Sequence, residues 1–291
     1  MKPVPPEVPR LLLGVSSLGQ PVRATRDRQL EVASRFKEPE SLAVALVKAV
    51  AAGAEALVVP PTNDVREALA ELHKDLPLLV RSPHASVADD LHWAPTLALE
   101  VGDDSTPGSW SPARAGAAVT NLLPLSMATD LASRVWPRIE REVGTFSVKS
   151  VRGILVPAAI TDLALAANEP KFFERLLKLA HSKVGLVGFE THNLGHLLSR
   201  LGPWEVSPDF VMGAVNPRGV GMMPDMARVL SEITTSPVKV IGCELRAGGL
   251  VALDEGAAYA RQHGCWGILA ELVDLDDVPK ELKSLGPGTA A

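Results

Sequence analysis

The chain has little of several features that would assign it to a specialised class of protein. Its two cysteines, Cys243 and Cys265, are too few for a disulfide framework and predict reduced thiols. It has no cluster of Lys and Arg, and its net charge of -5 argues against a nucleic-acid partner, because phosphate binding needs a basic face. No apolar run reaches the roughly 18 residues of a membrane span, and residues 1–6 lack the apolar core of a signal peptide. We therefore expect a cytoplasmic protein with no membrane or nucleic-acid partner, whose ligand is a small molecule.

Aromatic side chains are also scarce. They make up 4% of the residues, with a single tyrosine, so the core must be filled by Leu, Val and Ala, and stacking platforms for bases or sugars are few. Hydrophobic residues make up 46% and charged residues 22%, which is ordinary for a folded globular protein. We expect one domain over residues 1–291 with flexible ends at residues 1–9 and 286–291, and the composition leaves room for a homo-oligomer.

Short apolar runs alternate along the chain with stretches whose apolar residues have helical spacing. Runs of this kind are typical of buried parallel strands, and the alternation without hairpin signals favours a parallel sheet. The first run is not followed by Gly-x-Gly-x-x-Gly, which disfavours a dinucleotide-binding Rossmann fold. We therefore predict a closed (β/α)₈ barrel, an α/β fold whose strands lie at residues 11–16, 56–61, 76–82, 153–157, 184–192, 210–218, 238–246 and 265–271.

Residues 83–124 do not fit this alternation, because Pro, Gly, Asp and Ser interrupt them. We predict an irregular excursion between strands three and four. Within it, residues 96–101 have the composition of a strand. If they formed a barrel strand, one of the eight runs above would not.

The second half of the chain resembles the aldo-keto reductases. Residues 181–193 contain Gly188-Phe189-Glu190-Thr191-His192, which is similar to the family signature in which a strand ends in Gly-Val-Ser-Asn/Thr-His. Residues 211–217 are similar to the family's sixth strand, and residues 240–250, which end in Ala-Gly-Gly-Leu, are similar to its seventh. The first half resembles the family only in the order of its strands.

This resemblance implies a (β/α)₈ barrel, NADPH as cofactor, and a tetrad of Asp, Tyr, Lys and His that reduces carbonyl groups. The tetrad is absent here. Strand two ends in Pro60-Pro61-Thr62 instead of Asp, strand three in Arg81-Ser82 instead of Lys, and strand four in Val156-Pro157 instead of His, while the tyrosine is Tyr259 in a late helix. An arginine cannot relay a proton as lysine does, because its pKa stays above about 12. The sequence therefore predicts a divergent barrel of this kind that lacks the residues by which the family reduces carbonyl groups.

Charged side chains that could carry a different chemistry follow strands five and seven. Glu190 and His192 are two residues apart, so they would point to the same side if both stayed extended. We predict Glu190 as a base and His192 as an acid near the barrel mouth; the alternative is that Glu190 pairs with an arginine and His192 caps the next helix. Both could instead be metal ligands, with further ligands from Glu244, His84 or Glu271. A Glu-x-His pair alone is weak evidence for a metal, so no metal site is predicted.

Glu244 and Arg246 repeat this spacing on strand seven, and we predict Glu244 as a second catalytic carboxylate, or as the partner of Arg81, Arg218 or Arg246 in an ion pair. Cys243 alternates with Glu244, so we expect it to face the helices. The predicted substrate-binding residues are Arg81, Asn193, Asn216, Arg218 and Arg246.

Glycine-rich turns follow strands six and seven. Their backbone N–H groups could hold a phosphate, so Gly219, Gly221, Gly248 and Gly249 are the candidates for binding NADP or another phosphate. Turns of this kind are also common where no ligand binds.

Three functions are compatible with these residues. The first is acid–base chemistry on a small, anionic carbonyl or carboxylate compound at the ends of strands five to seven. The second is an NADP(H)-dependent oxidoreductase with a different catalytic set. The third is a barrel without catalytic activity that serves as a binding or assembly subunit, for which the loss of the tetrad is the supporting feature.

Overall fold

The structure is a computed structural model that describes residues 6–15, 26–72, 75–84 and 131–286. The strand-like residues 96–101 lie outside these ranges, so whether they form a strand stays open. The described strands account for a complete barrel without them.

Eight parallel strands close into a barrel in sequence order, and the first strand pairs with the last through Leu11↔Ile268 to Gly14↔Glu271. The prediction of a (β/α)₈ barrel is confirmed. The strands are β1 (Leu11–Gly14), β2 (Ala56–Val59), β3 (Leu78–Arg81), β4 (Val151–Val156), β5 (Leu186–Glu190), β6 (Phe210–Ala214), β7 (Lys239–Cys243) and β8 (Gly267–Glu271).

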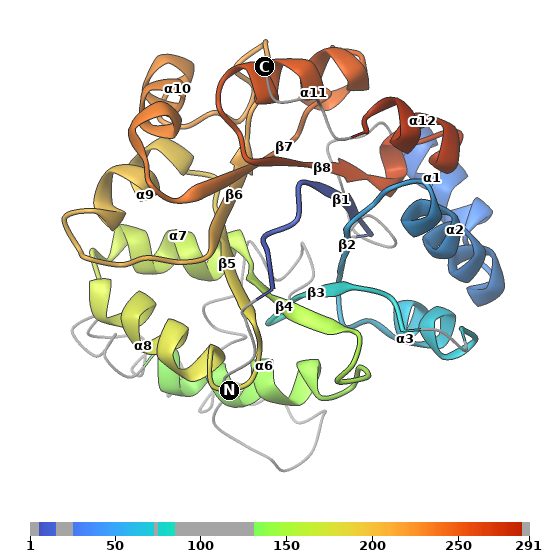
Figure 1. Ribbon diagram of the computed structural model, residues 1–291, viewed down its shortest axis with the longest axis horizontal. Helices are drawn as coiled ribbons and strands as arrows, with labels where there is room; N and C mark the ends of the chain where they lie inside the picture. The colour runs from blue at the N-terminus through green and yellow to red at the C-terminus, as the bar shows by residue number, and fades with distance from the viewer. Residues whose placement is uncertain (1–5, 16–25, 73–74, 85–130, 287–291) are drawn as a thin grey trace, which may run out of the picture.

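Helices form a ring around the barrel (Figure 1). The described ones are α1 (Arg26–Arg35), α2 (Pro39–Ala51), α3 (Asn63–Ala70), α6 (Leu131–Val143), α7 (Ala158–Ala166), α8 (Pro170–Ala180), α9 (Leu194–Leu201), α10 (Met226–Thr235), α11 (Leu253–Gln262) and α12 (Val278–Ser284). Two 3₁₀ turns, η2 (Ala247–Gly249) and η3 (Leu272–Asp274), follow β7 and β8. Within the described residues, none of the helices is long and apolar enough to cross a membrane.

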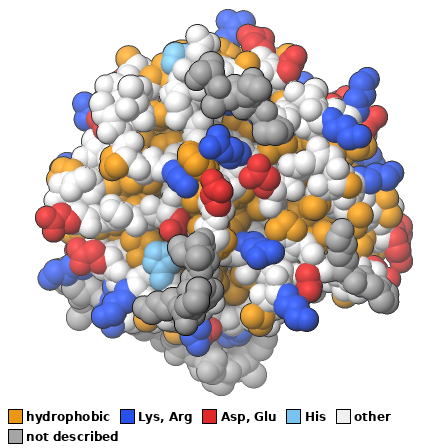
Figure 2. All heavy atoms as spheres, in the orientation of Figure 1, with side chains coloured by type: hydrophobic (Ala, Val, Ile, Leu, Met, Phe, Trp, Pro, Cys, Tyr) orange, Lys and Arg blue, Asp and Glu red, His pale blue; other side chains and the backbone are white. Residues whose placement is uncertain are grey.

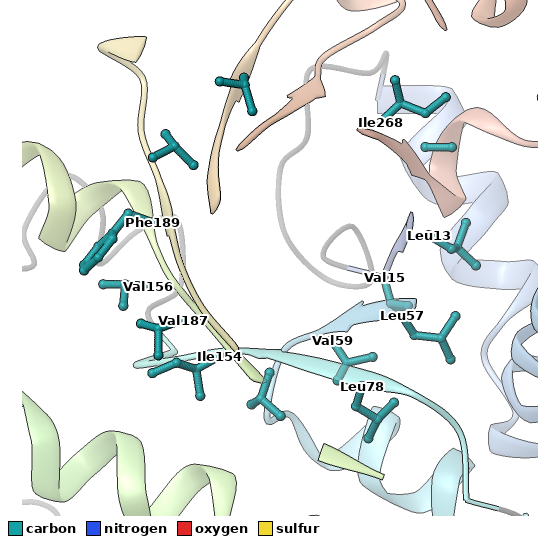
Figure 3. Close-up of a cluster of buried hydrophobic side chains, with 14 of the residues drawn as sticks. Leu13, Val15, Leu57, Val59, Leu78, Ile154, Val156, Val187, Phe189 and Ile268 are labelled. Carbon is teal, nitrogen blue, oxygen red and sulfur yellow. The ribbon is translucent and has the colours of Figure 1, made fainter. Parts of the chain in front are cut away.

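Because successive side chains of a strand point to opposite faces, the barrel has two apolar layers. The outer layer packs against the helices. The residues labelled in Figure 3, among them Leu57, Ile154 and Phe189, belong to this layer and point away from the barrel axis. The inner layer is a separate cluster that fills the barrel. It consists of Val8, Leu12, Ala56, Val58, Leu79, Leu155, Leu186, Phe210, Met212, Ile241 and Leu269. The barrel is therefore a packed core, and ligands must bind at its ends.

Residues Pro6–Arg10, which we call the strap, cross the barrel at the amino ends of the strands, as the dark blue segment of Figure 1 shows. The Trp266 indole donates a hydrogen bond to the carbonyl of Val8 at 2.9 Å, and the backbone N–H of Arg10 donates to Glu55 Oε2 at 2.8 Å. The strap lies so close to the strands that a Cβ at Gly267 would be 2.8 Å from the carbonyl oxygen of Arg10. These contacts tie the strap to the amino ends of the strands.

Candidate active site

The carboxyl ends of the strands, which we call the mouth, carry charged side chains that point into the barrel. On β8, Ile268 and Ala270 face the helices and Leu269 fills the barrel, so the alternation turns Glu271 inward. On β5, the same alternation places Val187 and Phe189 outward and Glu190 inward. An inward carboxylate at the end of a barrel strand lies where barrel enzymes hold their catalytic groups.

Arg81 and Glu190 form an ion pair across the mouth, from β3 to β5. Arg81 Nε donates to Glu190 Oε2 at 2.7 Å, and both side chains are largely buried, with exposures of 16% and 22%. Partial burial makes this charge pair stronger than one at the surface. Of the two outcomes predicted for Glu190, pairing with an arginine is the one observed, and it orients the carboxylate.

Glu271 is the carboxyl group whose environment is most unusual. The pKa of Glu271 is raised from 4.5 to about 8; burial is the largest cause, the nearby charges of Asp274, Glu190 and Glu244 add to it, and Arg81 opposes it. Gly14 on β1 makes room for this side chain, since a Cβ there would lie 2.5 Å from Glu271 Oε2. Glu271 is therefore protonated at neutral pH and can donate a proton.

The segments after β7 and β8 extend the charged cluster to the rim of the mouth. The pKa of Asp274, in η3, is raised to about 6; burial is the largest cause, Arg246 opposes it, and Glu244 adds to it. Arg246 Nη1 donates to the carbonyl oxygen of Asp274 at 3.1 Å and lies 4.0 Å from its carboxylate. Glu244 follows β7 with a φ of +55°, so it is not extended, and the expectation that Glu244 and Arg246 share a strand face does not apply.

His192 does not point to the same side as Glu190. β5 ends at Glu190, and the His192 side chain, 66% exposed, lies against α7, where its Nδ1 is 3.0 Å from Asp162 Oδ2. Asp162 also accepts hydrogen bonds from the backbone N–H of His192 and from the hydroxyl of Thr191. The structure therefore joins His192 to Asp162. The predicted Glu190–His192 pair required both residues to be extended, and the strand ends at Glu190.

The two asparagines hold the backbone of their loops. Asn216 is buried; its amide group donates to the carbonyl oxygens of Val220 at 2.8 Å and Glu244 at 3.2 Å, and its oxygen accepts from Val220 N–H at 3.0 Å. A side chain so fully used has no group left for a substrate. Asn193 is half-buried and occupies the position before α9.

Arg218 is exposed in the loop after β6, and within the described part of the chain it makes no hydrogen bond or ion pair. By contrast, Arg81 contacts Glu190 and Arg246 contacts Asp274. Of the three predicted anion-binding arginines, Arg218 is the one available to a ligand.

The glycines predicted to bind phosphate do not form a clear cradle for NADP. Gly219, Gly221, Gly248 and Gly249 all have positive φ, but the N–H of Gly219 donates to Asn216 O at 3.2 Å and that of Gly249 to Arg246 O at 2.9 Å. These two amides thus close their own turns. Two of the four amides are therefore not available to a phosphate.

The positions of the reductase tetrad hold other residues in the structure too. β2 ends at Val59 before Pro60, β3 ends at Arg81, and β4 ends at Val156 before Pro157. Tyr259 lies in α11, with its ring centroid 4.3 Å from that of His263. None of these three described strand ends carries the Asp, Lys or His of the tetrad.

Cys243 corrects one expectation about side-chain direction. It packs against the cluster inside the barrel, whereas alternation with Glu244 predicted that it would face the helices. The prediction failed because the extended backbone ends at Cys243, so the position of Glu244 does not indicate where the Cys243 side chain points.

Within the described residues, no group of three His, Cys, Asp or Glu side chains is placed to hold a metal ion.

Sequence reasoning missed Asp162 and Asp274, and it considered Glu271 only as a possible metal ligand and not as an acid. Glu271 could have been found as an acid, because it ends the fourth apolar run of the second half, just as Glu190 ends the first. Asp162 and Asp274 carry no such signal, because one lies inside a helix and the other in a turn.

Comparisons with known proteins show a likeness in structure only. No protein-family model and no curated protein matches the sequence. Two structures from Pseudomonas aeruginosa that are named as aldo-keto reductases match with a TM-score of 0.54, at 12% and 13% identity, covering 94% of this chain and 88% and 87% of theirs. An aldo-keto reductase from Brucella melitensis matches with a TM-score of 0.49 at 10% identity, covering 96% of this chain and 88% of its own. The predicted resemblance to an aldo-keto reductase barrel is confirmed at the level of the fold.

Proposed function

We propose that the protein is an enzyme that moves protons on a small carbonyl or carboxylate compound bound at the mouth of the barrel. The observation that carries this proposal is that Glu190 and Glu271 approach one barrel end from different strands in different environments. Glu190 is paired with Arg81, whereas burial keeps Glu271 protonated at neutral pH. A protonated carboxyl group beside a carboxylate that is held in an ion pair is what paired acid and base catalysis requires.

The roles follow from these environments. Glu190 takes a proton from the carbon next to the carbonyl group, and Arg81 holds its carboxylate in place. Glu271 gives a proton to the carbonyl oxygen, where negative charge develops. Arg218 binds the carboxylate of the substrate, because its guanidinium is exposed and makes no ion pair with the described residues.

Glu244 and His192 belong to the rim of the same site. Glu244 raises the pKa of both Glu271 and Asp274, so it favours their protonated forms. Asp162 holds Nδ1 of His192, which directs Nε2 away from α7 and makes His192 a second proton carrier for groups that enter from solvent.

Exchange of carbon-bound hydrogen tests the proposal without knowledge of the natural substrate. Purified protein is incubated in D₂O with a panel of 2-oxo acids, 2-hydroxy acids and aldehydes, and loss of the proton next to the carbonyl or carboxylate group is followed by NMR. We expect exchange with at least one compound, and a rate that falls by about 100-fold or more in Glu190→Gln and Glu271→Gln.

Glu67→Gln, a change at an exposed position on α3, is the matched control and should leave the exchange rate unaltered. Absence of exchange with every compound, or equal rates in the wild type and both mouth variants, would refute the proposal.

A further inference from the structure

The end of the barrel opposite the mouth, which we call the floor, contains a cavity of about 340 Å³. The strap forms one side of it, and the beginnings of β2, β3, β4 and β5 form the other. Its lining comprises Pro6, Glu7, Pro9, Glu55, Ala56, Pro77, Leu79, Arg152 and Leu186. This volume is at the lower end of the range for small-molecule sites.

The walls of this cavity are fixed. Pro6 packs so closely on the chain before β5 that a Cβ at Gly185 would lie 2.5 Å from its ring. Val8 is held by Trp266 and Arg10 by Glu55, and the three prolines of the lining have a restricted φ. A ligand would therefore bind without the cost of ordering a loop.

The lining combines an apolar base with charges of both signs. Ala56, Leu79 and Leu186 are buried members of the cluster that fills the barrel. Glu7, Glu55 and Arg152 are exposed at the edge. Figure 2, which views this face, shows acidic and basic side chains gathered close together at its centre.

These opposite charges do not neutralise one another. Among the described residues, Arg152 forms no ion pair with Glu7 or Glu55, and the contact made by a Glu55 oxygen is with the backbone N–H of Arg10. A cation and two anions therefore face one cavity with space between them. A purely anionic ligand would be repelled by the two glutamates and a purely cationic one by Arg152, whereas a molecule that carries both charges meets complementary groups.

We propose that this floor cavity is a second small-molecule site, which binds an α-amino acid with an apolar side chain. The carboxylate of the ligand pairs with Arg152, its ammonium group with Glu7 and Glu55, and its side chain rests on Leu79 and Leu186. The site is separated from the mouth by the packed interior of the barrel, so it does not depend on the proposed proton transfer.

The test uses the full chain and three probes of similar shape: L-leucine, 4-methylpentanoate, which lacks the ammonium group, and 3-methylbutylamine, which lacks the carboxylate. Binding is measured by NMR chemical-shift titration. We expect leucine to bind at least about 10-fold more tightly than either single-charge probe, which corresponds to about 1.4 kcal/mol.

Arg152→Gln should weaken leucine binding by about 10-fold or more and leave the binding of the amine unchanged or slightly stronger. Lys149→Gln, at an exposed position near Arg152 that does not line the cavity, is the matched control and should bind leucine like the wild type. The proposal is overturned if leucine shows no saturable binding, if the single-charge probes bind equally well, or if Arg152→Gln binds leucine normally.

Discussion

At the scale of single residues, the charge state of Glu271 makes a prediction that needs no substrate. Its pKa is about 8 in the folded protein and near 4.5 when the side chain is exposed, so the folded state binds the proton more tightly. This contribution to stability is fully present at low pH and is lost as the pH rises towards 8. The pKa of Asp274 is raised as well, but only to about 6. Between pH 6 and pH 8, Glu271 therefore dominates the change of stability with pH.

We therefore predict that the free energy of unfolding of the wild type falls, relative to that of Glu271→Gln, by roughly 2 kcal/mol between pH 6 and pH 8. Urea denaturation at several pH values measures it. Glu67→Gln should run parallel to the wild type, because the side chain is exposed. Parallel curves for the wild type and Glu271→Gln would show that the carboxyl group is ionised throughout this range.

At the scale of the elements, the position of the strap depends on Gly267 in β8, which has no side chain. A Cβ at Gly267 would lie 2.8 Å from the Arg10 carbonyl oxygen and 2.9 Å from that of Pro9, and neither backbone atom can move alone. We predict that Gly267→Ala destabilises the protein by about 1–3 kcal/mol and displaces the strap.

Hydrogen exchange can locate this effect. The amide of Ile268, which donates to the Arg10 carbonyl at 2.8 Å, should exchange faster in Gly267→Ala, while amides of β5 and β6 should change no more than global stability requires. Gly202→Ala is a suitable control, since a Cβ there meets nothing within 4 Å. Unchanged exchange at Ile268 would contradict the prediction.

The elements also show what could be predicted from the sequence. All eight apolar runs are strands, because a run of Leu, Val and Ile between helical patterns has one stable place in an α/β fold. The strand ends were predicted too far along: β6 stops at Ala214 and β7 at Cys243, each before the polar residues that we had included. Side-chain direction fails beyond these ends, which is why Cys243 and His192 point elsewhere than alternation suggested.

Contacts between distant segments were beyond prediction for a different reason. Arg81 and Glu190 are 109 residues apart, and Asp162 and His192 are 30 apart, so no local pattern links them. The raised pKa of Glu271 likewise arises from burial, which depends on the whole end of the barrel.

At the scale of the whole molecule, closure of the sheet joins the first strand to the last, and β1 contributes pairs to both β2 and β8. Removing one strand would expose two edges, so we predict that the expected single domain unfolds as one unit. Far-ultraviolet circular dichroism and tryptophan fluorescence should give the same urea midpoint, because Trp136, Trp204 and Trp266 are spread around the barrel. Two separated midpoints would instead indicate independent subdomains.

The strap has a practical consequence for handling the protein. Pro6 rests beside the floor cavity, against the start of β5, so a tag or surface linker attached ahead of it would emerge next to the cavity and could block it. The other described end follows α12, which packs against α2 on the helix ring. Because the ring helices run from the mouth back to the floor, this end also lies on the floor side, but on the helix ring and outside the lining of the cavity. A label at either end therefore sits on the floor face, and one that precedes Pro6 is next to the cavity.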